Sequence, residues 1–141
     1  MTYASQQNMI DRFGEREVIA LTDRNNDGAI DVAALTRGLE AADSEINTYL
    51  LDRYSLPLAS TPLVLADKAC DITRYLLCGA ETVATEDIRD RYKDAIKFLE
   101  KVQMGKASLG LNAAQAITQP NDQILTSTRP RVFDSCTLKD Y

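Results

Sequence analysis

Apolar residues recur at helical spacing along most of the chain. The clearest example lies in residues 31–54, where apolar positions are separated by alternating steps of three and four residues: Val32, Leu35, Leu39, Ala42, Ile46 and Tyr49. This spacing places all of them on one face of an α-helix. Pro57 follows shortly afterwards, and a proline ring prevents a helix from continuing. The pattern therefore predicts a long helix over residues 31–54.

Two further helical stretches are predicted by the same spacing and by residues typical of helix ends. The first covers residues 5–21, with Ser5 as its N-cap and an interruption at Gly14. The other covers residues 85–104 and begins at Thr85. Its charged residues form a solvated face, and we expect its apolar face to pack against the long helix within the subunit.

A helix over residues 61–79 is expected to be the most buried. Thr61 is predicted as its N-cap and Pro62 as its first helical residue, the position where a proline is tolerated. Its apolar residues surround most of the helix circumference, which is typical of a central helix that is covered on several sides.

The last part of the chain, residues 111–141, has a different pattern. Polar residues dominate, and Pro120 and Pro130 prevent a long helix. We therefore predict a mainly α-helical protein, with a compact bundle of about four to five helices over residues 1–110 and an extended C-terminal arm over residues 111–141. A segment that buries little of itself is expected to become ordered on a neighbouring molecule. The expected contact residues of the arm are Arg129, Arg131, Val132, Phe133, Leu138 and Tyr141.

Composition narrows the possible classes of protein. The 141 residues suit one domain. The formal net charge of −5 argues against a nucleic-acid binder, which usually has a basic face. No stretch approaches the ~20 apolar residues of a membrane span, and the N-terminus lacks the pattern of a signal peptide, so we expect a cytosolic protein without a membrane partner. Four tyrosines are interpreted as core-edge residues with solvated hydroxyls: Tyr49, Tyr54, Tyr75 and Tyr92.

The candidate chemistry is sparse. The chain has no histidine, which excludes Ser-His-Asp and Cys-His arrangements and His-ligated metals. Asp67, Asp71 and Arg74 lie on one side of the predicted 61–79 helix, where they form either an acid–base pair steered by the arginine or, as we favour, a salt bridge between helices. Cys70 and Cys78 are interpreted as small core residues. We expect neither an enzyme nor a cofactor.

The segment 23–34 resembles the beginning of a calcium-binding loop. Asp23, Asn25 and Asp27 occupy its first, third and fifth positions, glycine follows at the sixth, and Asp31 occupies the ninth. Position 12, which normally holds a bidentate glutamate, is Ala34. The same residue types also form turns and helix N-caps for backbone reasons alone. We favour that structural interpretation, and a small helical binding module with a degenerate calcium-type loop is the alternative.

A series of short segments, taken in order, covers nearly the whole chain and resembles the neck proteins of Mu-like phages and prophages, which are also called head-completion or head–tail connector proteins. The segments are Tyr3-Ala-Ser, Met9-Ile-Asp-Arg-Phe-Gly, Leu21-Thr-Asp-Arg, Asp27-Gly-Ala-Ile-Asp, Ile46-Asn-Thr-Tyr-Leu, Arg53-Tyr-Ser-Leu-Pro-Leu, Ala69-Cys-Asp-Ile-Thr-Arg-Tyr-Leu-Leu, Arg91-Tyr-Lys-Asp-Ala-Ile-Lys-Phe-Leu, Gly105-Lys-Ala-Ser-Leu-Gly, Arg129-Pro-Arg-Val-Phe and Leu138-Lys-Asp-Tyr.

This resemblance implies a helical structural protein that forms a homo-oligomeric ring, expected to be a dodecamer, beneath the portal of a DNA-filled head. Its expected partners are other copies of itself, the portal protein and a tail-side connector or terminator protein, while DNA only passes through the lumen. The implied location is the virion neck, with the bacterial host cytoplasm before assembly. The family supplies no catalytic residue to carry over.

Overall fold

The computed structural model describes residues 2–79 and 84–111, which form five helices and no strand. The helices are α1 (Gln6–Phe13), α2 (Glu15–Thr22), α3 (Val32–Leu50), α4 (Leu63–Leu77) and α5 (Glu86–Gln103). The prediction of a mainly α-helical protein is confirmed. The six predicted contact residues of the C-terminal arm lie outside the described residues.

Local side-chain chemistry sets the beginnings of three helices. Ser5 caps α1 and forms a reciprocal capping box with Asn8. Asp31 caps α3 by accepting the backbone N–H of Ala34 at 3.0 Å, and Thr85 caps α5. The predicted interruption at Gly14 is also confirmed. This residue has a φ of 85° and links α1 to α2, a conformation that glycine adopts without steric cost.

Two helices have different bounds from those predicted. The long helix ends at Leu50 rather than at residue 54, because the chain turns so that the Tyr54 side chain becomes buried. The following helix spans Leu63–Leu77 rather than 61–79, and Thr61 does not cap it. Pro62 is the N-cap itself, since its ψ of 143° is extended rather than helical.

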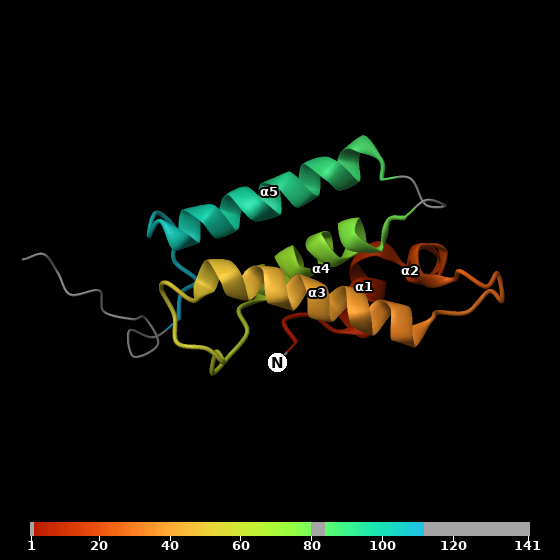
Figure 1. Ribbon diagram of the computed structural model, residues 1–141, viewed down its shortest axis with the longest axis horizontal. Helices are drawn as coiled ribbons and strands as arrows, with labels where there is room; N and C mark the ends of the chain where they lie inside the picture. Colours follow the sequence, from red (N-terminus) through yellow and green to blue (C-terminus); the bar gives the residue numbers. More distant parts are fainter. Residues whose placement is uncertain (1, 80–83, 112–141) are drawn as a thin grey trace, which may run out of the picture.

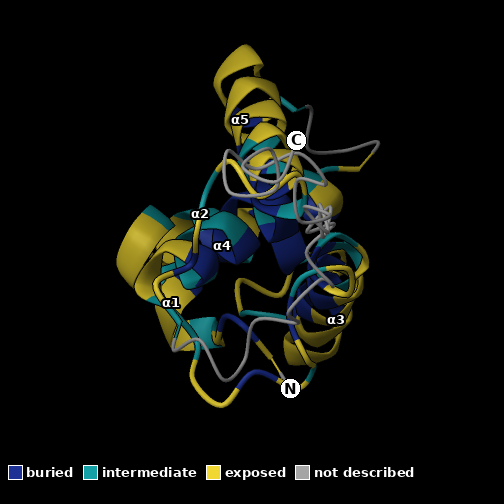
Figure 2. Ribbon diagram, turned by 90° about the vertical axis from the view of Figure 1, so that its left-hand side faces the viewer, coloured by how far each residue is buried: buried dark blue, intermediate teal, exposed yellow. Residues whose placement is uncertain are grey.

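Helix α4 is the centre of the bundle. It packs against each of the other four helices, and α3 and α5 lie on either side of it in Figure 1. The buried stretches of the helices lie toward the middle of the bundle (Figure 2). This confirms the predicted central position of α4, and the predicted contact between α3 and α5 is present as well. Three apolar residues near the two ends of α4 are nevertheless exposed: Leu63, Val64 and Leu76.

The two ends of the described chain are anchored on this bundle. The backbone N–H of Tyr3 donates to the Asp43 carboxylate of α3 at 2.9 Å, and burial raises the pKa of Asp43. After α5, the backbone N–H of Leu109 donates to the Tyr54 hydroxyl at 3.2 Å.

A second tyrosine hydroxyl also has a protein partner, because Tyr92 donates its hydroxyl to Glu45 at 2.7 Å. The expectation of a solvated hydroxyl is therefore wrong for Tyr54, which is buried, and the hydroxyl of the partly buried Tyr92 also has a protein partner.

Gly38 allows a close approach between α3 and α4. A Cβ atom added there would lie 2.8 Å from Cδ2 of Leu77 and 3.4 Å from Cγ2 of Thr73. We predict that Gly38→Val lowers the free energy of unfolding by about 1–3 kcal/mol, because the added methyl groups overpack this contact. Urea denaturation measures the effect. The control is Ala41→Val on the exposed face of α3, which should cost under ~1 kcal/mol. Equal losses in both variants would contradict the close helix contact.

Candidate functional site

One arginine of α1 binds two aspartates of α4. Arg12 Nη1 lies 2.9 Å from Asp67 Oδ1, and Nη2 lies 3.0 Å from Asp71 Oδ2. The Asp71 side chain is only 3% exposed, whereas that of Asp67 is 48% exposed. A buried carboxylate is costly unless a cation and hydrogen bonds compensate its charge. Arg12 supplies both, so the salt-bridge interpretation of Asp67 and Asp71 is confirmed.

Arg74, which was grouped with these aspartates, has other partners. Its guanidinium donates to Glu17 of α2, with Nε 2.6 Å from Oε1, and lies 3.4 Å from Asp87 of α5. It also lies over the Phe13 ring, 4.6 Å from the centroid, which is a cation–π arrangement. The hydrogen bond and the charge of Arg91 lower the pKa of Asp87, and the charge of Arg74 adds to this effect. The sequence triad therefore divides into two separate ion-pair clusters.

These clusters are suited to packing rather than to catalysis. Together they connect α1, α2 and α5 to the central helix, so that their charged groups have fixed partners. In the part of the chain that the structure describes, every fully buried side-chain nitrogen and oxygen has a hydrogen-bond partner. A general acid or base must instead be free to reach a substrate. The acid–base interpretation of Asp67 and Asp71 is not supported by this geometry.

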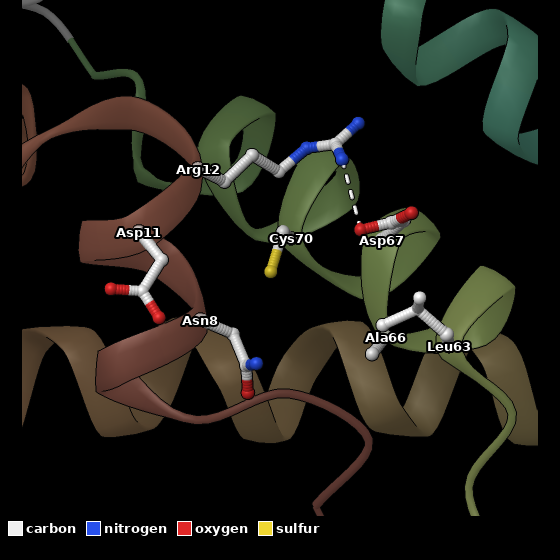
Figure 3. Close-up of a pocket in the computed structure, with 7 residues that line it drawn as sticks. All are labelled: Asn8, Asp11, Arg12, Leu63, Ala66, Asp67 and Cys70. Carbon is white, nitrogen blue, oxygen red and sulfur yellow. Dashed lines mark ion pairs between the residues drawn. The ribbon is translucent and has the colours of Figure 1, made fainter.

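A shallow pocket lies beside the Arg12 cluster. Its volume is about 330 Å³, at the lower end of the range for ligand sites. Helix α1 lines one side and α4 lines the other, as Figure 3 shows, with Arg12 and Asp67 bridging the two. The lining residues are Asn8, Asp11, Arg12, Leu63, Ala66, Asp67 and Cys70. The pocket thus combines an apolar side with exposed carboxylates.

The two described cysteines are unpaired, and Cys70 belongs to the core, as predicted. Burial raises the pKa of the Cys70 thiol to about 11. Cys78 is partly buried, and its thiol donates to the backbone carbonyl of Arg74 at 3.3 Å. Burial raises the pKa of Cys78 as well. Because the thiolate is the reactive form, neither environment activates a nucleophile. Cys136 lies outside the described residues.

The 23–31 segment extends from the end of the bundle between α2 and α3 (Figure 1). The two carboxylate oxygens of Asp23 accept the backbone N–H groups of Asp27 and Gly28 at 3.1 and 2.8 Å. These hydrogen bonds lower the pKa of Asp23, with the Gly28 bond the largest cause. Asp27 accepts from the backbone of Ala29 at 3.0 Å. The side chains that match a calcium loop are thus used to close a turn.

A calcium site at this segment would also lack ligands. Asp31 is used as the N-cap of α3, and Ala34 at loop position 12 is buried and has no side-chain oxygen. Across residues 2–79 and 84–111, no three or more cysteine, aspartate or glutamate side chains are grouped so that they suit a metal ion. The geometry of Asp23, Asp27 and Asp31 is that of a structural turn followed by a helix cap.

Sequence reasoning did not identify Arg12 or Phe13 as functional neighbours of α4. Arg12 is 59 residues from Asp71 along the chain, so no local spacing links them. The one available signal was an aspartate on a predicted central helix, since a buried carboxylate requires a cation from another element.

None of the described helices is both long enough and apolar enough to cross a membrane.

The structure is a helical bundle in which two ion-pair clusters join the outer helices to α4, and comparison with known proteins gives its family. The family model described as Bacteriophage Mu, Gp36 matches residues 3–127. The chain belongs to this family and is thus a Mu-like phage protein.

Two relatives extend the similarity over nearly the whole chain. The Mu-like prophage FluMu protein gp36 of Haemophilus influenzae is 32% identical over 139 residues, covering 99% of this chain and 97% of that protein. Gene product J of Escherichia phage Mu is 30% identical over 135 residues, covering 94% of each chain.

Loss of the Arg12 cation should strongly destabilise the bundle. Arg12→Met leaves Asp71 buried without a partner, so we predict a decrease of about 3–5 kcal/mol in the free energy of unfolding, measured by urea denaturation. The Arg12→Met/Asp71→Leu double variant should recover part of this loss. Lys93→Met, which removes an exposed pair with Asp90, is the control and should cost under ~1 kcal/mol. A loss in Arg12→Met as small as in this control would contradict the role of the pair.

Calcium should leave the protein unchanged. Asp23 and Asp31 are engaged with backbone N–H groups, so we expect no heat of binding in a calorimetric titration with micromolar to millimolar calcium, and no shift in the thermal unfolding midpoint. An EF-hand protein provides the positive control. Micromolar binding that disappears in Asp23→Ala would instead favour the binding-module alternative.

Proposed function

We propose that this protein is a structural component of the phage neck, where it forms an oligomeric ring that joins the portal of the DNA-filled head to the tail. The observation that carries the proposal is the similarity to the Bacteriophage Mu, Gp36 family over residues 3–127, together with a resemblance to neck proteins that extends through the arm. Under this proposal the protein acts through its surfaces rather than through a catalytic centre.

The described surface supports an assembly role. Four large hydrophobic residues are more than half exposed: Val32, Leu51, Leu63 and Met104. Leu51 and Met104 follow the C-terminal ends of α3 and α5, next to a hydrogen bond of 2.7 Å that joins Gln103 to Asp52. Subunits in a closed ring bury two different surfaces against each other. Apolar side chains at separate ends of one bundle are suited to such contacts.

The proposed partners follow from this position in the virion. The first partner is the chain itself, with about twelve copies in a ring of closed cyclic symmetry. The portal protein binds one face of this ring, and a tail-side connector or terminator protein binds the other. DNA passes through the lumen, where an acidic chain with a net charge of −5 would repel the phosphate backbone. The protein would reside in the host cytoplasm until it joins the head.

Deletion of most of the C-terminal arm should prevent assembly without affecting folding. A chain that lacks residues 118–141 keeps the bundle and the Tyr54–Leu109 bond, so we predict a folded monomer with an unchanged thermal unfolding midpoint. We also predict that it neither forms rings on portal-containing heads nor joins heads to tails, as measured by electron microscopy and by complementation of a phage that lacks the gene. The full chain is the control. Normal joining by the truncated protein would contradict the role of the arm.

A further inference from the structure

We propose that the pocket between α1 and α4 binds the segment Arg129-Pro-Arg-Val-Phe of a neighbouring copy of this chain. The inference rests on the proposed assembly into a ring and deepens it, because it assigns the receiving surface for the arm. Three independent properties of the chain support this occupant, namely exposed apolar area, charge and reach.

The apolar side of the pocket is unusually exposed for its place in the fold. Leu63 is 78% exposed, the highest value among the large hydrophobic residues that the structure describes, and the adjacent Val64 is 38% exposed. Both begin the helix that is otherwise the centre of the core. Covering such side chains with other apolar groups is favourable. Val132 and Phe133 would supply those groups.

The charges of the pocket and of the segment are complementary. Arg12 is the one cation among the lining residues, and it is paired with Asp67 and with the buried Asp71. Asp11 also lines the pocket. Asp67 is paired with Arg12 and is still 48% exposed. Among the residues that the structure describes, the Asp11 side chain accepts a hydrogen bond from the neutral Gln7 amide, at 2.7 Å, and forms no ion pair. Residues 129–133 contain two arginines and no acidic residue. Arginine binds carboxylates through paired N–H donors.

The length of the intervening chain allows contact with another copy. The described chain ends at Leu111, which is 18 residues before Arg129. At about 3.3 Å per extended residue, that segment spans up to about 60 Å, which exceeds the length of the bundle helices. In a ring, an arm on one face that enters a pocket on the next copy is a heterologous contact, the kind that closes a cycle.

The first test measures binding to the pocket without requiring a ring. A fluorescent peptide of residues 126–136 is titrated into the full chain carrying Arg129→Glu and Arg131→Glu, whose own arm should no longer compete. We expect saturable binding by anisotropy that weakens as salt is raised. A scrambled peptide should not bind. Equal binding of both peptides, or no binding of either, would overturn the proposal.

A matched pair of variants locates the site. Leu63 and Val32 are each the first residue of a helix, and each is more than half exposed. The helices that they begin, α4 and α3, start at opposite ends of the pair (Figure 1). Glutamate at either position places the same negative charge at the first residue of a helix, where the helix dipole favours it. We predict that Leu63→Glu weakens peptide binding at least tenfold, whereas Val32→Glu changes it less than twofold. Similar effects of both variants would exclude the α1–α4 pocket.

A crosslinking test distinguishes a neighbouring copy from the same chain. Leu63→Cys and Val132→Cys are placed in separate, differently sized copies with Cys136→Ser, and the mixture is oxidised on portal-containing heads. We expect a covalent dimer that contains one copy of each, and none when Val32→Cys replaces Leu63→Cys. A single chain that carries both Leu63→Cys and Val132→Cys and forms only an intramolecular disulfide would overturn the proposal. Rings that join heads to tails without this dimer would leave the neck function standing and refute the pocket contact alone.

Discussion

The buried carboxylate of Asp71 is the constraint on which the arrangement of the bundle depends. It lies on the central helix at 3% exposure, and a charge in that position requires a cation that reaches it from another helix. Arg12 meets this requirement through Nε and Nη2, and in doing so fixes α1 against α4. Since α1 carries the rest of one pocket wall, the same ion pair also determines the shape of that pocket.

A second cation completes the attachment of the outer helices. Arg74 lies between Glu17, Asp87 and the Phe13 ring, so that α2 and α5 are joined to the same central helix from another side. Exposed ion pairs contribute little to stability, but the Arg74 side chain is only 13% exposed and its charge is screened less by water. Two partly buried arginines therefore hold the short helices α1 and α2, which at eight residues each would be unstable alone.

A feature of this structure could be predicted from the sequence when the residues that determine it lie close together along the chain. Apolar spacing and caps act over a few residues, so the helices and the caps at Ser5, Asp31 and Thr85 could be predicted. The end of α3 could not, because it depends on where the Tyr54 ring finds a buried position. The site was harder still. The sequence grouped Asp67, Asp71 and Arg74 on one helix. Their partners lie on other helices, and Arg12 and Glu17 are more than 50 residues away along the chain. The 23–34 loop was ambiguous because carboxylates bind backbone N–H groups and cations with the same oxygens.

The charge distribution explains why a ring of this chain would need an arm. Residues 112–141 contain three basic and three acidic residues, so residues 1–111 carry the whole net charge of −5. Identical acidic bodies repel one another over roughly the Debye length of 8–10 Å, and a contact between like surfaces would bring equal charges together. Arg129 and Arg131 concentrate positive charge in one short segment. A contact of that segment with Asp11 and Asp67 of the next copy would replace repulsion by attraction, and only a head-to-tail arrangement allows every copy in a closed ring to make it.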